Sequence, residues 1–225
     1  MVDIIDAIII RKSIRDFKAN PVPKQILKEI LDTAARAPSA ENSQPWEFTI
    51  IAGEVLNAIR RANVEKLNSG APSHPDLQTK GFPLDSAYRR RQIEIAKQIF
   101  KLMDIAREDK EKRDQWMNRG FRFFNAPAAI VVYVDRSLSY PRPLFDIGAV
   151  TQNICLAALH YGLGTCIANQ GIAFPEVLHK FAGIPESKRI MISIAIGYPN
   201  WDFPANKVAS KREPIEDIST WIGFE

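Results

Sequence analysis

The sequence has few of the residues that build disulfide frameworks and metal centres. Its 225 residues include two cysteines and three histidines, which are Cys155, Cys166, His74, His160 and His179. Two cysteines cannot form a disulfide framework, and no Cys-x-x-Cys or His-x-x-x-His pair indicates a metal site. No apolar run approaches the roughly 18 residues that cross a bilayer, and acidic residues precede the first basic ones, unlike in a signal peptide. We therefore expect a soluble cytoplasmic protein without a metal or a membrane partner.

The motifs of nucleophilic and nucleotide-hydrolysing enzymes are also missing. The sequence has no Gly-x-Ser-x-Gly elbow and no Walker loop. Its Gly162-Leu163-Gly164 turn lacks the third glycine and the following helix of a dinucleotide fingerprint. Cys166 has no activating base among its neighbours, so we expect a buried structural thiol. A chain with polar loops but no catalytic side chains indicates that a cofactor carries the chemistry.

The charge balance is mildly basic. There are 30 lysines and arginines against 26 aspartates and glutamates, which gives a net charge of +4. Such a balance suits nucleic acid in some proteins, but between residues 88 and 114 the two signs alternate as on a solvated helix. The one dense basic cluster, Arg89-Arg90-Arg91, has Tyr88 as its only neighbouring aromatic residue. We therefore expect a phosphate-bearing small molecule rather than a nucleic acid.

Apolar periodicity and turn residues predict one α+β domain over residues 1–225, with more helix than strand and a small sheet. The tail after Pro199 ends in apolar residues and should pack on another surface, such as a second subunit. The predicted helices span 3–11, 23–37, 54–66, 86–118 with a break near Asp109, 145–161 and 174–182, and the predicted strands span 48–51, 128–134 and 190–197.

The first helix ends in a basic segment that also contains a hydroxyl group. Arg11, Lys12, Ser13 and Arg15 lie within five residues, and arginine forks bind phosphate oxygens bidentately. Cations that complement the dipole of a helix end would explain Arg11 and Lys12. They would not explain Ser13 and Arg15 together, which favours a phosphate or flavin site.

The loop from Arg36 to Trp46 joins the second helix to the first strand. Its hydrogen-bonding groups suit a flat polar ligand, but an ordinary helix-to-strand connection uses the same residue types. Residues alone leave both readings open. The residues with ligand-binding potential in this loop are Pro38, Ser39, Asn42 and Gln44.

Five landmarks in order resemble the FMN-dependent nitroreductase family, and the middle of the chain resembles its nitrobenzoate-reductase branch. The family begins with an Arg-x-Ser-x-Arg/Lys segment and continues with a Pro-Ser-x-x-Asn-x-Gln-Pro-Trp loop. A central helix then leads into a Gly-Leu-Gly turn, and Gly-Tyr-Pro and a late arginine before proline follow. In this chain the landmarks are Arg11 to Arg15, Pro38 to Trp46, Gln152 to Gly164, Gly197-Tyr198-Pro199 and Arg212-Glu213-Pro214.

The resemblance implies an interlocked α+β homodimer, in which helices surround a small mixed or antiparallel sheet and two flavins bind at the interface. It further implies non-covalent FMN, hydride from NADH or NADPH, and two-electron reduction of a nitroaromatic or quinone acceptor by a ping-pong mechanism. No side chain is then expected to be catalytic, because flavin N5 carries the chemistry.

By resemblance, Arg11, Lys12 and Ser13 bind the flavin phosphate, Arg15 reaches the pyrimidine edge, and Arg212 closes from the C-terminal side. The lysine that the family has two residues before this arginine is Ser210 here, so Lys211 is a substitute. The other residues implied are Pro38, Ser39 and Asn42 from the partner subunit, Gln44 in the same loop, Ala168, Asn169 and Gln170 beside the ring, and Asn68 as a candidate mid-chain contact.

Residues 68–120 form a charged insert that we interpret as a helical lid over the acceptor, with Tyr88 and Phe124 close to it in sequence. Rivals within the same fold are a reductive dehalogenase, an enone reductase and a flavin-destroying synthase. The alternative that is not an enzyme is a protein that binds flavin without turnover.

Overall fold

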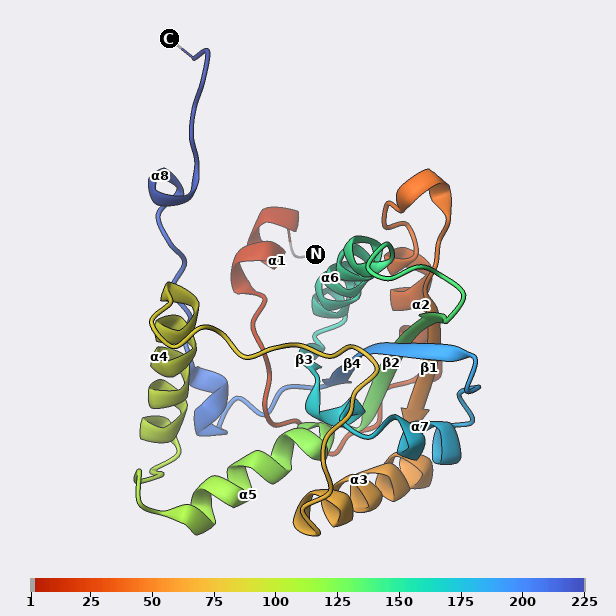
Figure 1. The fold of residues 1–225 in the computed structure, drawn as a ribbon, viewed down its shortest axis with the longest axis vertical. Helices are drawn as coiled ribbons and strands as arrows, with labels where there is room; N and C mark the ends of the chain where they lie inside the picture. The colour runs from red at the N-terminus through yellow and green to blue at the C-terminus, as the bar shows by residue number, and fades with distance from the viewer. Residues whose placement is uncertain (1–2, 225) are drawn as a thin grey trace.

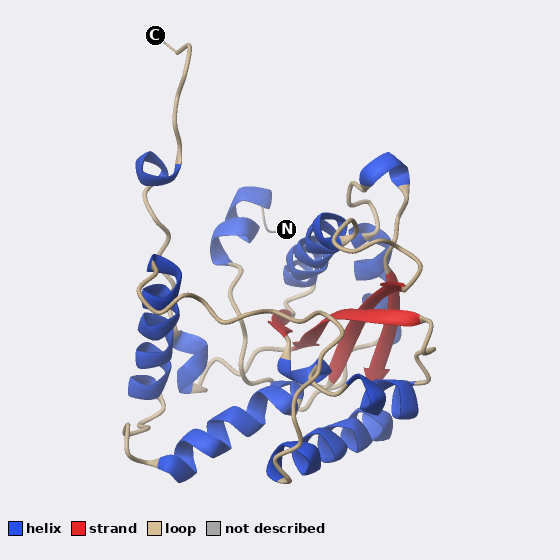
Figure 2. Ribbon diagram, in the orientation of Figure 1, coloured by secondary structure: helices blue, strands red, loops and turns tan. Residues whose placement is uncertain are grey.

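A computed structural model describes residues 3–224 and has a four-stranded antiparallel sheet at its centre (Figures 1 and 2). The strand order is β1-β2-β4-β3, so the short strand β3 lies at one edge. All three predicted strands are confirmed, each within two residues of its predicted ends, and residues 164–168 form a fourth strand that was not predicted. The strands are β1 Glu47–Ala52, β2 Ala128–Asp135, β3 Gly164–Ala168 and β4 Lys188–Gly197.

Helices cover both faces of this sheet, which explains why the central strand β2 is apolar almost throughout. Helices α2 and α6 pack together on one face, and α3 and α7 pack together on the other. Each side has its own cluster of buried side chains, and Ile130 and Ala129 of β2 point into opposite clusters. The helices are α2 Lys24–Ala34, α6 Leu144–His160, α3 Gly53–Asn68 and α7 Pro175–Ala182.

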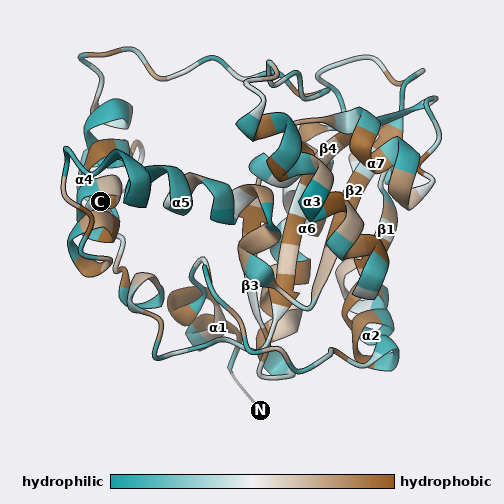
Figure 3. Cartoon of the chain, turned by 90° about the horizontal axis from the view of Figure 1, so that it is seen from below, coloured by the Kyte–Doolittle hydropathy of each residue, from teal (hydrophilic) through white to brown (hydrophobic). Residues whose placement is uncertain are grey.

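The predicted helix over 86–118 is two helices, α4 Ala87–Leu102 and α5 Lys110–Phe121, with the break at the predicted place. The Asp109 side chain accepts a hydrogen bond from the Lys112 N–H at 2.9 Å and so caps α5. Helix α5 packs on α3, whereas α4 stands away from the sheet beside η4 (Pro204–Lys207). In Figure 3, α5 is largely hydrophilic, as expected of a helix with one buried end. Within residues 3–224, no helix combines the length and apolarity that a membrane crossing requires.

Helix α1 (Ile4–Ile10) leaves its apolar side uncovered in the single chain. Ile9 is 73% exposed, and only Ala7 of the helix is buried. The same holds for the tail beyond Pro214, which carries the short helix α8 (Ile215–Ile218) and extends away from the body (Figure 1). Exposed apolar surface of this kind marks an interaction site.

A left-handed turn, η2 (Phe123–Asn125), joins α5 to β2. Its three residues have φ values of 53°, 52° and 59°, a region that non-glycine residues seldom adopt. Arg60 holds the turn, because its Nε donates to the Arg122 carbonyl at 3.0 Å and its Nη2 donates to the Ala126 carbonyl. Burial lowers the pKa of Arg60 to about 10. This value is still well above neutral pH, so the side chain stays charged there. Phe124, which lies close to the insert in sequence, is only 7% exposed and packs in the core.

Replacing Arg60 should therefore destabilise the fold. In Arg60→Leu both carbonyls lose a charged donor, and we expect the free energy of unfolding to fall by about 2–3 kcal/mol. Urea denaturation would measure this change. Arg61→Leu, at an exposed position of the same helix, is the control and should change stability by less than about 0.5 kcal/mol. Equal losses in the two variants would show that Arg60 does not support the turn.

Candidate functional site

The basic segment after α1 runs along the free edge of β3. Ser13 forms a parallel bridge with Thr165, and the Ile14 N–H donates to the Thr165 carbonyl at 2.9 Å. The Ile14 side chain is 2% exposed and anchors the segment in the core. This short pairing brings Arg11, Lys12, Ser13 and Arg15 together beside β3, as the sequence predicted for a single binding element.

The cations of this segment are not neutralised by acidic side chains. Within residues 3–224, no carboxylate forms an ion pair with Arg11, Lys12 or Arg15. Burial lowers the pKa of Arg15, and burial together with the charge of Arg15 lowers the pKa of Lys12. Both shifts arise because burial disfavours the charged form, and a bound anion would stabilise that form. The segment therefore has the electrostatics of a phosphate-binding site.

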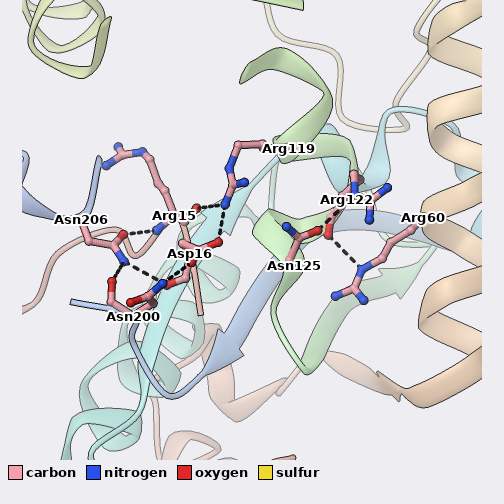
Figure 4. A network of polar contacts seen from close by, with 8 residues as sticks. All are labelled: Arg15, Asp16, Arg60, Arg119, Arg122, Asn125, Asn200 and Asn206. Atoms are coloured by element: carbon pink, nitrogen blue, oxygen red, sulfur yellow. Dashed lines mark hydrogen bonds and ion pairs between the residues drawn. The ribbon is translucent and has the colours of Figure 1, made fainter. Parts of the chain in front are cut away.

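Asn206 ties the backbone of Arg15 to the C-terminal part of the chain (Figure 4). Its side chain is 1% exposed, and its Oδ1 accepts from the Arg15 N–H at 2.6 Å. Its Nδ2 donates to the Asp16 carbonyl at 2.9 Å and to the Asn200 carbonyl at 2.7 Å. Residues 16–18 also pair with residues 198–200 in an antiparallel manner. The two ends of the sequence thus meet at this site.

Arg119 of α5 holds the same segment from the other side (Figure 4). Its Nη2 donates to the Arg15 carbonyl at 3.0 Å and pairs with the Asp16 carboxylate. Its guanidinium group lies 4.3 Å from the ring centroid of Phe203. The backbone of Arg15 is therefore fixed by two separate parts of the chain, Asn206 and Arg119, which positions the residue beside β3.

The free edge of β3 continues beyond this segment. Because Thr165 turns its carbonyl toward Ile14, the alternation of an antiparallel strand places the backbone groups of Ile167 on the same edge. Ile167 is 43% exposed there. Ala168 is buried, and its carbonyl accepts from the Ser193 hydroxyl at 2.5 Å. The edge offers backbone N–H groups to a flat ligand.

Both cysteines are free, buried thiols near the basic segment. Burial raises the pKa of Cys166 to about 11, and burial likewise raises the pKa of Cys155. A protonated buried thiol is a poor nucleophile, which agrees with the structural role expected for Cys166. Within residues 3–224, no group of three His, Cys, Asp or Glu side chains is placed to hold a metal ion.

Lys211 and Arg212, the basic residues near the end of the chain, lie on the segment after η4. This segment runs beside α4. The Ala209 N–H donates to Gln98 Oε1 at 3.0 Å, and Arg91 pairs with Glu213 at 2.6 Å. Lys211 and Arg212 between these two ties are exposed. The structure therefore places both on the α4 side of the molecule, without a direct contact to Arg11–Arg15 in the described part of the chain.

The loop from Arg36 to Trp46 is strained and faces solvent. Glu41, Asn42 and Gln44 have φ values of 54°, 56° and 44°, and such strain is common at ligand sites. The Ser39 hydroxyl accepts from the Gln44 N–H at 3.0 Å. The loop, with η1 (Ala40–Asn42) at its tip, lies across α6 from α1 (Figure 1). The single chain thus does not bring Pro38, Ser39, Asn42 or Gln44 to its own Arg11–Arg15 segment.

Asn68 is the exposed last residue of α3, and no contact among residues 3–224 joins it to the basic segment. Sequence reasoning missed a different asparagine. The Oδ1 of Asn118 is buried and lacks a hydrogen-bond partner within the described residues, as does the Nε of Arg119. Buried polar atoms without a partner are unusual and need a reason. The only sequence signal that Asn118 lies near a buried site was the change within α5 from charged residues to Gly120-Phe121.

The comparison with known proteins identifies this architecture. The profile of the Nitroreductase family matches residues 8–198. The chain belongs to the nitroreductase family. Nitrobenzene nitroreductase of Ectopseudomonas oleovorans is 30% identical to it over 215 residues, which are 94% of this chain and 93% of that protein. The 4-nitrobenzoate reductase of Pseudomonas putida is 27% identical over 226 residues, covering 100% and 98% of the two chains.

Solved structures agree with this assignment. The crystal structure of the FMN and NADPH-dependent nitroreductase NfnB from sphigopyxis sp. strain HMH has a TM-score of 0.93 against this chain at 25% identity. The alignment covers 99% of this chain and 100% of that one. Membership of the family makes this chain an oxidoreductase, and it confirms the fold that the sequence motifs implied, with an antiparallel sheet.

Removing the side chain of Asn206 should loosen the basic segment. In Asn206→Ala the Arg15 N–H and the Asp16 carbonyl lose their partner, so the free energy of unfolding should fall by about 2–3 kcal/mol. Thermal and urea unfolding would measure it. Asp202→Ala, at an exposed position of the same loop, is the control and should stay within about 0.5 kcal/mol of the unsubstituted protein. An Asn206→Ala variant with an unchanged free energy of unfolding would contradict the role of Asn206 in fixing the basic segment.

Proposed function

We propose that this protein is an FMN-dependent oxidoreductase that takes hydride from NADH or NADPH and reduces nitroaromatic acceptors, with quinones as further acceptors. The observation that carries this proposal is the set of unneutralised cations beside the free edge of β3 in a nitroreductase fold. The relatives named above are reductases of nitrobenzene and 4-nitrobenzoate, and the similar structure is FMN and NADPH-dependent. No observation favours the dehalogenase, enone reductase or non-catalytic alternatives.

The charges and hydrogen-bonding groups of the residues present fit FMN. The phosphate would bind to Arg11, Lys12 and Ser13, and Lys211 and Arg212 would approach it from the α4 side. Arg15 would reach the pyrimidine edge of the ring. The uncompensated cations and the lowered pKa of Arg15 and Lys12 support this arrangement.

The flavin ring would lie along the edge of β3, next to Ala168, Asn169 and Gln170. The backbone groups on that edge supply hydrogen bonds to a flat heterocycle. The unpartnered Oδ1 of Asn118 suits an N–H of the pyrimidine. We therefore propose Asn118 in place of Asn68 as the mid-chain contact with the cofactor.

Bound FMN would supply the hydride and electron transfer, first from the nicotinamide and then to the acceptor, in alternation. The chain's own residues bind, orient and stabilise charge. The half-buried Arg15 cation would stabilise negative charge on the pyrimidine end, where low local polarity strengthens its effect. No side chain is required to carry a proton in this scheme.

A second copy of the chain would complete each site. Helix α1 and the tail expose an apolar surface that a homodimer would cover, and this covering would interlock the subunits. The partner's loop would then bring Pro38, Ser39, Asn42 and Gln44 to the flavin. We also propose a single domain over residues 1–225, a lid role for α4 within the 68–120 insert, and a reducing cytoplasmic location, which suits two free thiols.

Stopped-flow spectroscopy tests the function directly. The purified protein should be yellow, NADPH or NADH should bleach its visible absorbance, and a nitroarene should restore it under anaerobic conditions. A colourless protein that fails to bind added FMN would refute the proposal. A yellow protein that neither nucleotide bleaches would support the alternative of a flavin-binding protein without turnover.

Arg15→Ala should weaken FMN binding by about tenfold or more, because a hydrogen bond to a charged group contributes about 1.5–3 kcal/mol. Quenching of FMN fluorescence during titration of the apoprotein measures the dissociation constant. Arg61→Ala serves as the control for losing one positive charge from the surface. Equal affinities in the two variants would exclude Arg15 from the cofactor site.

Ile9→Glu should prevent dimerisation, because it places a charge in the middle of the exposed apolar surface. Analytical ultracentrifugation should show a monomer, and the monomer should lose FMN because the partner's loop is absent. Val55→Glu, on α3, alters a residue that is also partly exposed, at 45%, and should stay dimeric. A monomeric Ile9→Glu that retains full FMN affinity would refute the shared site.

A further inference from the structure

An open pocket lies beside the proposed flavin position, between the loop after α3 and η3 (Gln170–Ile172). Its volume is about 420 Å³. All of its lining residues are uncharged: Ser73, Pro75, Gln78, Thr79, Phe121, Asn169, Gln170 and Ala173. Two of them, Asn169 and Gln170, are also the residues proposed to lie beside the flavin ring. The pocket therefore adjoins the place where an acceptor must approach.

The outer wall of the pocket is fixed. The His74 N–H donates to the Ala173 carbonyl at 3.0 Å, which ties the loop to η3. Asp76 accepts from the Ile190 N–H at 2.8 Å and pairs with Arg136 at 2.7 Å, which ties the loop to the sheet. The pocket is thus formed before a ligand arrives, and this part of the insert is a wall rather than a mobile cover.

The charged side chains of His74, Glu176 and Lys66 do not line the pocket, and they pair with one another. His74 Nε2 lies 2.9 Å from one carboxylate oxygen of Glu176, and Lys66 lies 2.7 Å from the other. No cation lines the pocket to receive an anionic ligand.

Neutral hydrogen-bonding groups line the pocket instead. Within residues 3–224, no side-chain hydrogen bond occupies Gln78, Thr79, Asn169 or Gln170. The Gln170 carboxamide lies directly over Gly120, where an added Cβ would come within 1.9 Å of its Oε1. The ring of Phe121 supplies an apolar surface for a flat ring. The pocket combines this ring surface with amides that both donate and accept.

We propose that this pocket binds the substituted end of the aromatic acceptor and selects a neutral polar substituent over a carboxylate, with Gln170 as the selecting residue. The inference rests on the proposed function and names its substrate class. A carboxylate would lose part of its hydration without gaining a cation. A carboxamide or a nitro group would exchange its water contacts for the amides of the pocket at little cost.

Benzamide and benzoate test the selection without turnover, because neither is reducible here. Isothermal titration of the FMN-loaded protein should give a dissociation constant about tenfold lower for benzamide. Steady-state kcat/KM should favour 4-nitrobenzamide over 4-nitrobenzoate in the same direction. Equal or tighter binding of benzoate would overturn the inference.

Gln170→Arg places a cation in the pocket and should strengthen benzoate binding about fivefold, the scale of a partly exposed ion pair. Gln25→Arg on the exposed side of α2 is the charge-matched control and should leave both ligands unaffected. Benzoate binding that is unchanged in Gln170→Arg would exclude Gln170 as the selecting residue.

Gly120→Ala tests the position of the carboxamide, since the new methyl group must displace it. We expect benzamide to bind about three- to fivefold more weakly while FMN stoichiometry stays at one per chain. FMN binding and bleaching by nucleotide report on the proposed function separately. A functional flavoprotein that binds benzamide and benzoate equally would refute this inference and leave the proposed function standing.

Discussion

The carboxamide of Asn206 is the contact on which the basic segment depends most. It is buried, and it bonds to the backbone on both sides of the Arg15–Asp16 peptide as well as to the chain at Asn200. Without it, a short segment paired with the edge strand by a single bridge would have to position the half-buried Arg15 cation by itself. Because Asn206 lies near one end of the sequence and Arg15 near the other, the site can form only when nearly the whole chain has folded.

The elements of this fold were predictable because local rules and tertiary packing agree in them. Strand β2 is apolar throughout, and its burial on both faces follows from that composition. The break between α4 and α5 was visible at Asp109, whose side chain then caps α5. The cations from Arg11 to Arg15 could be expected at one place because their spacing in sequence keeps them together. In each case the decisive information lies within about 15 residues of sequence.

The rest depends on contacts that no local pattern encodes. Asn118 and Asn206 are ordinary polar residues in sequence, and only the folded chain makes one unpartnered and the other a tether. Phe124 is close in sequence to the charged insert, but the left-handed turn held by Arg60 directs it into the core. Asn68 looked suitable by its position in the sequence, yet it ends a helix that packs elsewhere. Long-range hydrogen bonds and backbone strain account for these differences.

The separation of the Pro38–Gln44 loop from the Arg11–Arg15 segment across α6 has a genetic consequence. If each site takes cations from one subunit and a loop from the other, a chain with defective cations and a chain with a defective loop are each inactive alone. Mixed together, they assemble heterodimers in which one of the two sites has both parts intact. Two null alleles would then complement each other to at most half of the normal number of sites per dimer. Two alleles that damage the same part would never do so.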